Sequence, residues 1–270
     1  MREARSVDTV IITPTLGNRE SLVRTVDSVQ QVGGERVKHV LVCPQHVQNE
    51  LRDRFPHCEV MAEPNKSGVY GAVNTGLNAA KQDCLYVGYI NDDDSWLKDF
   101  HRLFDVLDQN RDVSIAYARV LFVDCDGKPI FESTSSEYYK SFKYLLARGA
   151  VSITQQATLF RREVFERLGG FDCSYSIVAD NDFWLRAIEA GFKMEYVNCV
   201  CATFMLQPGQ LSSNREQAGI ELEHLLKQHA ITKDWRAFYE FMRFRIQNIP
   251  NYWKRLKGNR LMDVKSLLRE

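Results

Sequence analysis

The sequence predicts an α/β protein built on a parallel, doubly wound sheet, with a helical extension at its C-terminal end. Three observations lead to this fold class. Short β-branched runs alternate with helix-like segments over residues 7–62, the β-α-β-α-β order that is typical of parallel sheets. A further apolar run, residues 85–90, leads into three consecutive aspartates at 92–94, where open α/β sheets bind ligands. From residue 216 onward the pattern becomes wholly helical.

The individual elements follow from apolar spacing and from the residues that end strands and helices. Prolines end the first two strands at Pro14 and Pro44, and paired glycines end the first helix at Gly33 and Gly34. An Asp-Gly pair marks a hairpin turn before residue 129. The expected strands cover residues 7–12, 37–43, 59–62, 85–90, 113–122, 129–132, 158–160 and 196–204. The expected helices cover residues 22–33, 50–55, 72–80, 99–107, 161–168 and 183–188, and the helical region after residue 216 breaks at Ile249-Pro250.

Composition and charge narrow the functional classes. The 270 residues are 44% apolar and 26% charged, which is ordinary for a globular protein. Lys plus Arg and Asp plus Glu balance at 35 each, so the overall charge does not indicate a nucleic-acid partner. The sequence shows no CxxC pair, no N-terminal secretion signal and no membrane-spanning apolar run, so we expect reduced thiols in the cytoplasm. The cysteines and histidines at 199, 201, 224 and 229 are interpreted as packing or surface residues and not as metal ligands.

Asp92, Asp93 and Asp94 are the strongest chemical signal in the sequence. Adjacent carboxylates repel one another and add nothing to a fold, and at the end of a buried strand they lie where a ligand would bind. Mg²⁺-type cations are commonly held by one or two carboxylates together with substrate phosphates, so the motif indicates a metal–diphosphate site. The alternative is an acidic loop, or a helix that starts near Trp96 and is capped by Asp92 or Asp94.

Seven segments form an ordered set of motifs over about residues 7–214. They are IITPT at 11–15, EPNKSGVYGAVNTG at 63–76, YINDDD at 89–94, QQATLFR at 155–161, GGFD at 169–172, ADNDFWLR at 179–186 and, more weakly, GQLSS at 209–213. In order and spacing they resemble the family 2 glycosyltransferases, in particular small cytoplasmic enzymes that build bacterial surface polysaccharides and glycolipids. The resemblance implies the GT-A fold, with a mixed, mostly parallel sheet flanked by helices. The implied catalytic domain covers 1–214, with a nucleotide-sugar half at 1–97 and an acceptor half at 98–214, and a helical extension covers 215–270.

The resemblance also implies roles for individual residues of the donor site. The acidic motif of the family places one carboxylate near the donor ribose and the next on Mn²⁺ or Mg²⁺, which corresponds to Asp93 and Asp94, with Asp92 beside them. The metal would neutralise the departing diphosphate of the nucleotide-sugar. The other implied donor-binding residues are Pro14 and Thr15 at the nucleobase, Lys66 at the base or phosphate, and Ser212 and Ser213 over the diphosphate.

Asp180 corresponds to the carboxylate that acts as catalytic base in this family. The acceptor hydroxyl must lose its proton as it bonds to the anomeric carbon, and a carboxylate within hydrogen-bond reach can accept that proton. The resemblance implies a single inverting displacement. Asp180 and Asp182 also fall at the start of a predicted helix, so a helix N-cap is the structural alternative, and the two roles are compatible.

The residues after the second strand depart from the family pattern. The family usually has an acidic residue there that contacts the nucleobase, whereas this chain has Cys43-Pro44-Gln45. The departure leaves the nucleobase open and weakens the case for uridine, although UDP- and dTDP-sugars remain the expected donors. The QxxRW motif of processive synthases is absent, which predicts the transfer of single sugars. The expected acceptor is a carbohydrate or a lipid-linked saccharide.

Two other functions compete with sugar transfer. A sugar nucleotidyltransferase uses a similar sheet and metal, but its glycine-rich, Arg-containing loop after the first strand is missing, because residues 13–19 contain only Gly17. The second alternative is a non-catalytic module that binds a nucleotide or a sugar, and the altered motif after the second strand motivates it.

The C-terminal region from Lys233 onward is basic and rich in aromatic residues, with ten Lys or Arg against four Asp or Glu. Basic, aromatic helices can lie on anionic membrane surfaces, so one hypothesis is peripheral contact with the inner face of the cell membrane through residues 235–260. The other hypothesis is a helical subdomain whose aromatic residues pack on the core while its basic face is solvated.

Overall fold

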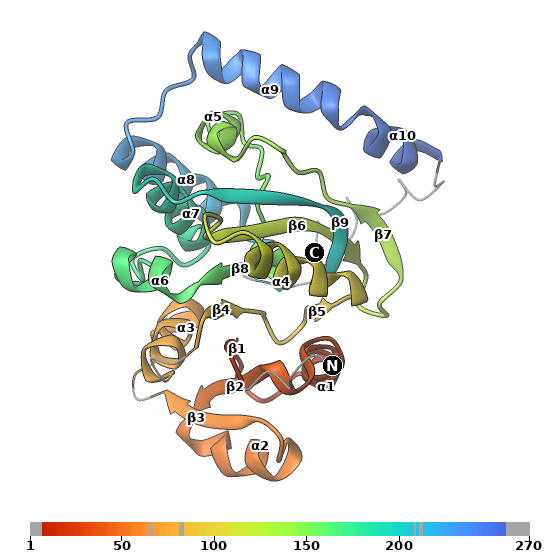
Figure 1. Cartoon of the computed structure of the whole chain (residues 1–270), viewed down its shortest axis with the longest axis vertical. Helices are drawn as coiled ribbons and strands as arrows, with labels where there is room; N and C mark the ends of the chain where they lie inside the picture. The colour runs from red at the N-terminus through yellow and green to blue at the C-terminus, as the bar shows by residue number, and fades with distance from the viewer. Residues whose placement is uncertain are drawn as a thin grey trace.

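The computed structural model describes residues 7–63, 65, 67–80, 84–207, 209–210 and 213–257. One nine-stranded sheet runs through both halves of the chain (Figure 1). Its order is β3 (Glu59–Glu63), β2 (Val37–Pro44), β1 (Thr9–Pro14), β4 (Tyr86–Tyr89), β8 (Thr158–Arg161), β6 (Ile115–Val123), β9 (Met194–Met205) and β5 (Ser95–Trp96), with β7 (Pro129–Glu132) beside β6. Strands β5, β7 and β8 run opposite to the others, so the sheet is mixed and mostly parallel, as expected.

The first half of the chain is a parallel βαβ arrangement in which helices cover β1 to β4. These helices are α1 (Ser21–Gly33), α2 (Gln48–Arg54) and α3 (Gly68–Ala79). Gly76 lets α3 approach the sheet closely, because a Cβ there would lie 2.8 Å from Cδ1 of Ile12 and 2.9 Å from Cγ2 of Val42. Strands β1 and β4 are paired in parallel, so their carboxyl ends open at the same edge of the sheet.

Alternate residues of β1 face separate cores. Ile12 packs on the side of α3, α6 (Arg162–Leu168) and α7 (Ala179–Glu189), whereas Ile11 packs on the side of α4 (His101–Gln109). Both faces are buried, which explains why the strands appear in the sequence as continuous apolar runs. Short 3₁₀ turns cover Gly34–Arg36, Gln45–Val47, Lys98–Phe100, Tyr139–Ser141 and Gln155–Ala157.

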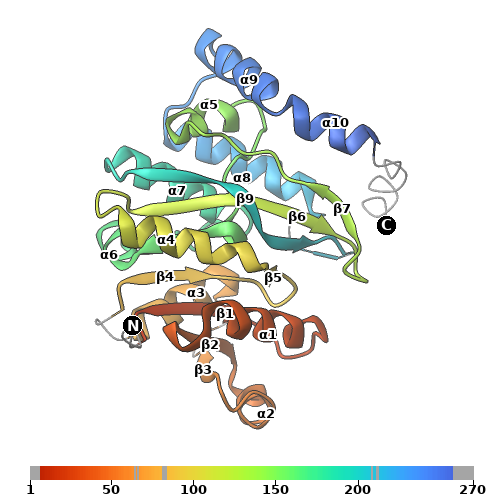
Figure 2. The same cartoon turned by 45° about the vertical axis from the view of Figure 1, so that its right-hand side comes forward.

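Three helices, α8 (Arg215–Gln228), α9 (Trp235–Gln247) and α10 (Ile249–Lys257), end the described chain. α8 lies beside α7, whereas α9 and α10 run end to end across the side of the molecule far from β1, next to α5 (Phe142–Leu146) and β7 (Figures 1 and 2). The predicted break at Ile249-Pro250 is confirmed, since α10 begins there. Within the residues that the structure describes, no helix is long and apolar enough to cross a membrane.

Candidate functional site

A cavity of about 460 Å³ opens at the sheet edge where β1 and β4 end. Pro14 and Tyr89, the last residues of these two strands, line it. The acidic motif, Asp92 to Asp94, lines the cavity together with Asp180 from the start of α7. The structure therefore gathers the predicted metal ligands and the predicted catalytic base, which are far apart in the sequence, around one space.

Asp94 is the most buried member of the acidic motif, at 1% exposure. Its Oδ1 accepts the backbone N–H of Met205 at 2.9 Å, and its Oδ2 accepts an amide N–H of Gln156 at 2.8 Å. Burial, together with the neighbouring carboxylate, raises the pKa of Asp94 well above its ordinary value. Strand β5 begins directly after Asp94, so the alternative prediction of a capped helix starting near Trp96 is wrong.

Arg19, from the turn after β1, faces the other two carboxylates. Its Nη1 donates to Oδ2 of Asp93, and its Nε lies 3.5 Å from Oδ1 of Asp92. Oδ2 of Asp93 also accepts amide N–H groups from Gln207 and Gln210 at 2.8 and 3.0 Å. Burial raises the pKa of Asp92, against the lowering effect of its hydrogen bonds and of the guanidinium. Arg19 belongs to the loop after the first strand, and no local pattern in the sequence predicted this cation at the site.

The other predicted donor-site residues have mixed outcomes. Thr15 is buried, and its hydroxyl donates to Oδ2 of Asp92 at 2.7 Å, so it ties the loop after β1 to the acidic motif. Ser213 is partly buried and is not among the described residues that line the cavity. Lys66 and Ser212 lie outside the described residues.

Asp180 is the second residue of α7 and lines the cavity. The N-cap position belongs to Val178, so the N-cap alternative for Asp180 is wrong, and its Oδ1 accepts the N–H of Asn181 at 2.8 Å instead. The side chain keeps some contact with solvent, but the surrounding protein desolvates it and raises the pKa of its carboxyl from 3.8 to about 7. A carboxyl that titrates near neutral pH is suited to proton transfer.

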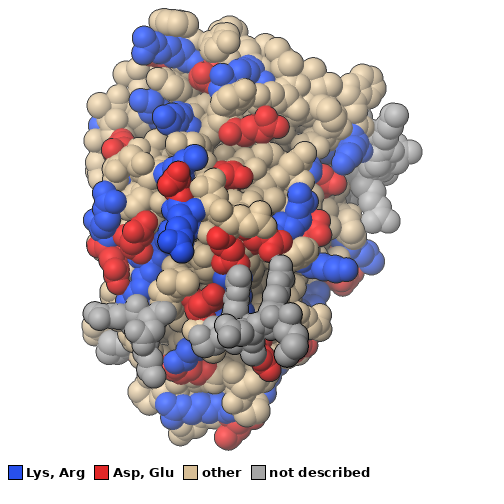
Figure 3. Space-filling view, viewed as in Figure 1, with Lys and Arg blue, Asp and Glu red and all other residues tan. Residues whose placement is uncertain are grey.

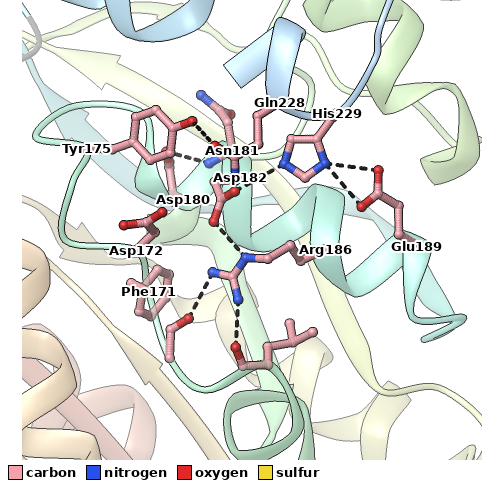
Figure 4. A network of polar contacts seen from close by, with 12 residues as sticks. Phe171, Asp172, Tyr175, Asp180, Asn181, Asp182, Arg186, Glu189, Gln228 and His229 are labelled. Atoms are coloured by element: carbon pink, nitrogen blue, oxygen red, sulfur yellow. Dashed lines mark hydrogen bonds and ion pairs between the residues drawn. The ribbon is translucent and has the colours of Figure 1, made fainter. Parts of the chain in front are cut away.

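A buried polar network near Asp180 ties α7 to the end of α8 (Figure 4). Asp182 is fully buried, and its two oxygens lie 2.7 Å from Nε of Arg186 and 3.1 Å from Nε2 of His229. Nδ1 of His229 lies 3.0 Å from a carboxylate oxygen of Glu189. The interpretation of His229 as a surface or packing residue missed this network, because no local pattern links it to α7.

Glu221 on α8 holds the loop that leads into α7. Its carboxylate accepts the backbone N–H groups of Ser176, Ile177 and Val178 at 3.0, 2.8 and 3.2 Å. Burial opposes the charge, but these hydrogen bonds and one from Gln217 outweigh it and lower the pKa of Glu221. The three loop residues line the cavity, so α8 fixes part of the cavity wall. The sequence pattern at this position predicts a helix but not the role of Glu221.

The chemistry of the acidic motif fits a divalent cation whose coordination is completed by a substrate. Over the described part of the chain, no group of three or more His, Cys, Asp or Glu side chains forms a ready-made metal site. Asp93 and Asp94 nevertheless have adjacent carboxylates at the cavity. Two carboxylates with diphosphate oxygens and water satisfy a Mg²⁺-type ion.

Comparison with known proteins relates the chain to one enzyme family. The model of glycosyl transferase family 2 matches residues 10–169. A crystal structure of S. aureus TarS 1-349 in complex with UDP superposes with a TM-score of 0.61 at 14% identity, covering 90% of this chain and 72% of that one. The complex with UDP-GlcNAc gives a TM-score of 0.64 at 14% identity, with 90% and 73% covered. No curated protein sequence matches significantly.

Proposed function

The chain belongs to glycosyl transferase family 2, and we propose that it transfers a sugar from a nucleotide-sugar to a carbohydrate acceptor by an inverting, metal-dependent displacement. The observation that carries the proposal is the shared cavity, which the acidic motif and Asp180 line together. A departing diphosphate needs positive charge, and an attacking hydroxyl needs a base. The carboxylates of the acidic motif would supply the metal site, and the carboxylate of Asp180 would supply the base. Membership of the family argues against the nucleotidyltransferase and the non-catalytic module.

The proposed donor is a UDP- or dTDP-sugar. The structures of TarS with UDP and UDP-GlcNAc, which share this fold, support the uridine nucleotide. Pro14 and Thr15 lie beside the acidic motif, where the nucleoside end of the donor would bind. Asp93 and Asp94 would hold Mn²⁺ or Mg²⁺, which when bound supplies positive charge to the leaving diphosphate.

Asp180 is the proposed general base. Its carboxylate accepts the proton of the acceptor hydroxyl while the oxygen of that hydroxyl bonds to the anomeric carbon. The bond from the anomeric carbon to the diphosphate oxygen breaks, and its electron pair leaves with the nucleoside diphosphate. Attack on the face opposite the leaving group inverts the anomeric configuration. Burial raises the pKa of Asp180 to about 7, so the carboxylate is basic enough to take the proton near neutral pH.

The proposed acceptor is a carbohydrate used in polysaccharide or glycolipid biosynthesis on the cytoplasmic side of the membrane. Tyr70, Phe122 and Phe204 line the cavity. Aromatic side chains are common in ligand pockets because they offer large apolar faces, and here they suit the C–H faces of sugar rings.

A thermal-shift panel tests the donor site with UDP, dTDP, GDP and CMP, each with and without Mn²⁺. A ligand that binds only the folded state raises the Tm. We expect one nucleotide to raise the Tm only with Mn²⁺, and Asp94→Asn to abolish this rise. Asn is expected to fold at this position, because it removes a charge that burial disfavours and because the side-chain amide of Gln156 can turn so that its oxygen accepts from the new NH2 group. Asp53→Asn, at an exposed position of α2, is the matched control and should behave like the unaltered protein.

Transfer assays then test the reaction itself. With the donor that the panel identifies, NMR of the product should show an inverted anomeric centre. A retained configuration would contradict the displacement that we propose. Pyrophosphate release from a sugar 1-phosphate and a nucleoside triphosphate would point to nucleotidyl transfer instead. Nucleotide binding that Asp94→Asn leaves unchanged would point to a non-catalytic site.

A further inference from the structure

The outward face of α9 and α10 carries a continuous row of large apolar side chains. The row consists of Trp235, Phe238, Met242, Ile246, Ile249 and Trp253, which follow one another at steps of three or four residues. Such spacing places all six on one side of a helical rod. Each is between 41% and 72% exposed, although burying such side chains is normally favourable.

The opposite face of the same helices is fixed to the protein. Ala237, Phe244 and Asn248 are buried, and the side-chain amide of Asn248 donates to the carbonyl of Ser135 at 3.0 Å. At the end of α10, Arg255 donates to the carbonyl of Glu132 at 2.6 Å. The helices therefore cannot turn the apolar row inward without breaking these contacts. The hypothesis that the aromatic residues of this region pack on the core does not hold for the apolar row.

Cations flank the apolar row. Arg236, Arg245 and Lys254 are exposed, although Lys254 also lies 3.5 Å from a carboxylate oxygen of Glu132, and residues 233–257 contain seven basic residues against two acidic ones. One of those acids, Glu240, is paired with Arg243. In Figure 3 acidic and basic side chains alternate over the middle of the molecule, whereas the end formed by α9 is largely uncharged surface with Lys and Arg and a few acidic side chains among it. An apolar face edged by cations is the pattern of a helix that lies in the interface of an anionic bilayer.

We propose that the outer face of α9 and α10 docks onto an anionic lipid bilayer. The row has tryptophans at both ends, Trp235 and Trp253, and tryptophan favours the level of the lipid headgroups. Ile246 and Ile249 between them offer aliphatic surface that suits acyl chains and has no hydrogen-bonding group for a polar partner. Positive flanks match the negative headgroups of the lipid.

The docked face lies next to the rim of the cavity. Arg148 donates to the carbonyl of Asp234 at 3.3 Å and lies over the ring of Phe238, while its neighbours Gly149 and Val151 line the cavity. Docking would therefore hold this rim close to the headgroups. The acceptor that we infer from this placement is a saccharide carried on a lipid anchor. This inference about the acceptor rests on the proposed sugar transfer, whereas the docking itself does not.

Vesicle flotation with the full chain tests the docking. We expect the protein to float with vesicles of phosphatidylcholine containing phosphatidylglycerol, to float poorly with phosphatidylcholine alone, and to dissociate as salt is raised. The triple variant Trp235→Ser/Ile246→Ser/Trp253→Ser should lose roughly tenfold or more of its vesicle partition, because the apolar contribution is removed. Leu85→Ser, at an exposed apolar position just before β4, is the matched control and should float like the unaltered protein.

Vesicle flotation tests the docking, whereas the Tm and the nucleotide shift test the proposed donor site. The triple variant should keep the Tm and the Mn²⁺-dependent nucleotide shift of the unaltered protein, since none of its positions lines the cavity. Failure of the unaltered protein to float would overturn the docking while leaving the donor site untouched. A dimer in light scattering that the triple variant dissociates would also overturn it, because the row would then be a subunit interface.

Discussion

The carboxyl group of Asp180 lies in a place where the folded protein disfavours its ionised form. An aspartate in an unfolded chain titrates near 3.8, whereas burial in the folded protein raises the pKa of Asp180 to about 7. The folded state therefore binds a proton more tightly than the unfolded state does. The destabilisation is absent below the unfolded pKa and fully present above pH 7, so it grows as the pH rises between these values. A side chain that lowers stability at the working pH is typical of a functional site.

Asp180→Asn tests both consequences at once. We expect kcat to fall by roughly 10²- to 10⁴-fold, because the base is lost, while the nucleotide shift with Mn²⁺ remains. The same variant should melt at a higher temperature than the unaltered protein at pH 8, and this gain should vanish near pH 4. Asp112→Asn, at an exposed position, is the control for both measurements. A variant that keeps full kcat would remove Asp180 from the mechanism.

The pH profile of the unaltered enzyme provides a second measurement on the same residue. A general base must be deprotonated, so kcat/KM should rise with pH through about 7, the pKa of Asp180, and level off above it. Below that value the rate should fall by about tenfold for each pH unit. A profile that stays flat between pH 5 and pH 8 would contradict the assignment.

Short motifs predict a site residue when the residues that share its function are its neighbours in the sequence. The three aspartates at the end of a strand are of this kind, whereas Asp180 at the start of α7 was expected from the family resemblance, and the structure places all four around one cavity. Arg19 is different, because its partner Asp93 lies 74 residues further along the chain. Nothing near Arg19 in the sequence indicates that pairing, which exists only once β1 and β4 lie side by side.

At the scale of elements, α8 supports the helix that carries the proposed base. Glu221 accepts three backbone N–H groups from the loop before α7, and His229 contacts the buried Asp182 within α7. Charged hydrogen bonds of this kind are stronger than neutral ones and leave costly unpaired groups when they are removed. Through these contacts α8 fixes the start of α7 at the cavity.

Glu221→Gln should weaken the hydrogen bonds between α8 and the loop before α7 without removing the helix. The amide has no charge and turns one of its ends into a donor, so it cannot accept all three N–H groups. We expect a lower Tm and a several-fold lower kcat with little change in KM for the donor, because the donor-binding motif lies elsewhere in the cavity. Glu223→Gln, two residues further on an exposed face, should leave both values unchanged. Equal kinetics for the two variants would reduce Glu221 to a purely structural role.

Most helices and strands are predictable from local patterns in the sequence, whereas some strands are defined only by their pairing with another strand. The second strand, expected at 37–43, covers Val37–Pro44, and the helix expected at 161–168 covers Arg162–Leu168. Strand β5, with only two residues, has no periodic pattern and was missed, since it is defined by antiparallel pairing with β9. Such tertiary pairing is invisible to local patterns.

At the scale of the whole molecule, the site is assembled from segments that lie between Pro14 and Leu222 in the sequence. Family similarity covers residues 10–169, yet Asp180 and Glu221 lie beyond it. The cavity wall includes Ala218 and Leu222 of α8, so we expect the catalytic unit to need residues beyond 214, the end predicted for the catalytic domain. The outer helices α9 and α10, in contrast, contribute no described residue to the cavity wall.

Shortened chains distinguish these two kinds of C-terminal helix. A chain that ends at Lys233 keeps α8, so we expect it to retain Mn²⁺-dependent nucleotide binding and transfer to a soluble acceptor. It should lose vesicle flotation and some stability, because the buried Phe244 is removed. A chain that ends at Asn214 lacks α8, and with it the carboxylate of Glu221 that holds the loop before α7 and the fully buried Leu225, so it should lose transfer and melt much lower. Full transfer by that shorter chain would show that α8 is dispensable for the site, and flotation by the chain ending at Lys233 would locate membrane contact elsewhere.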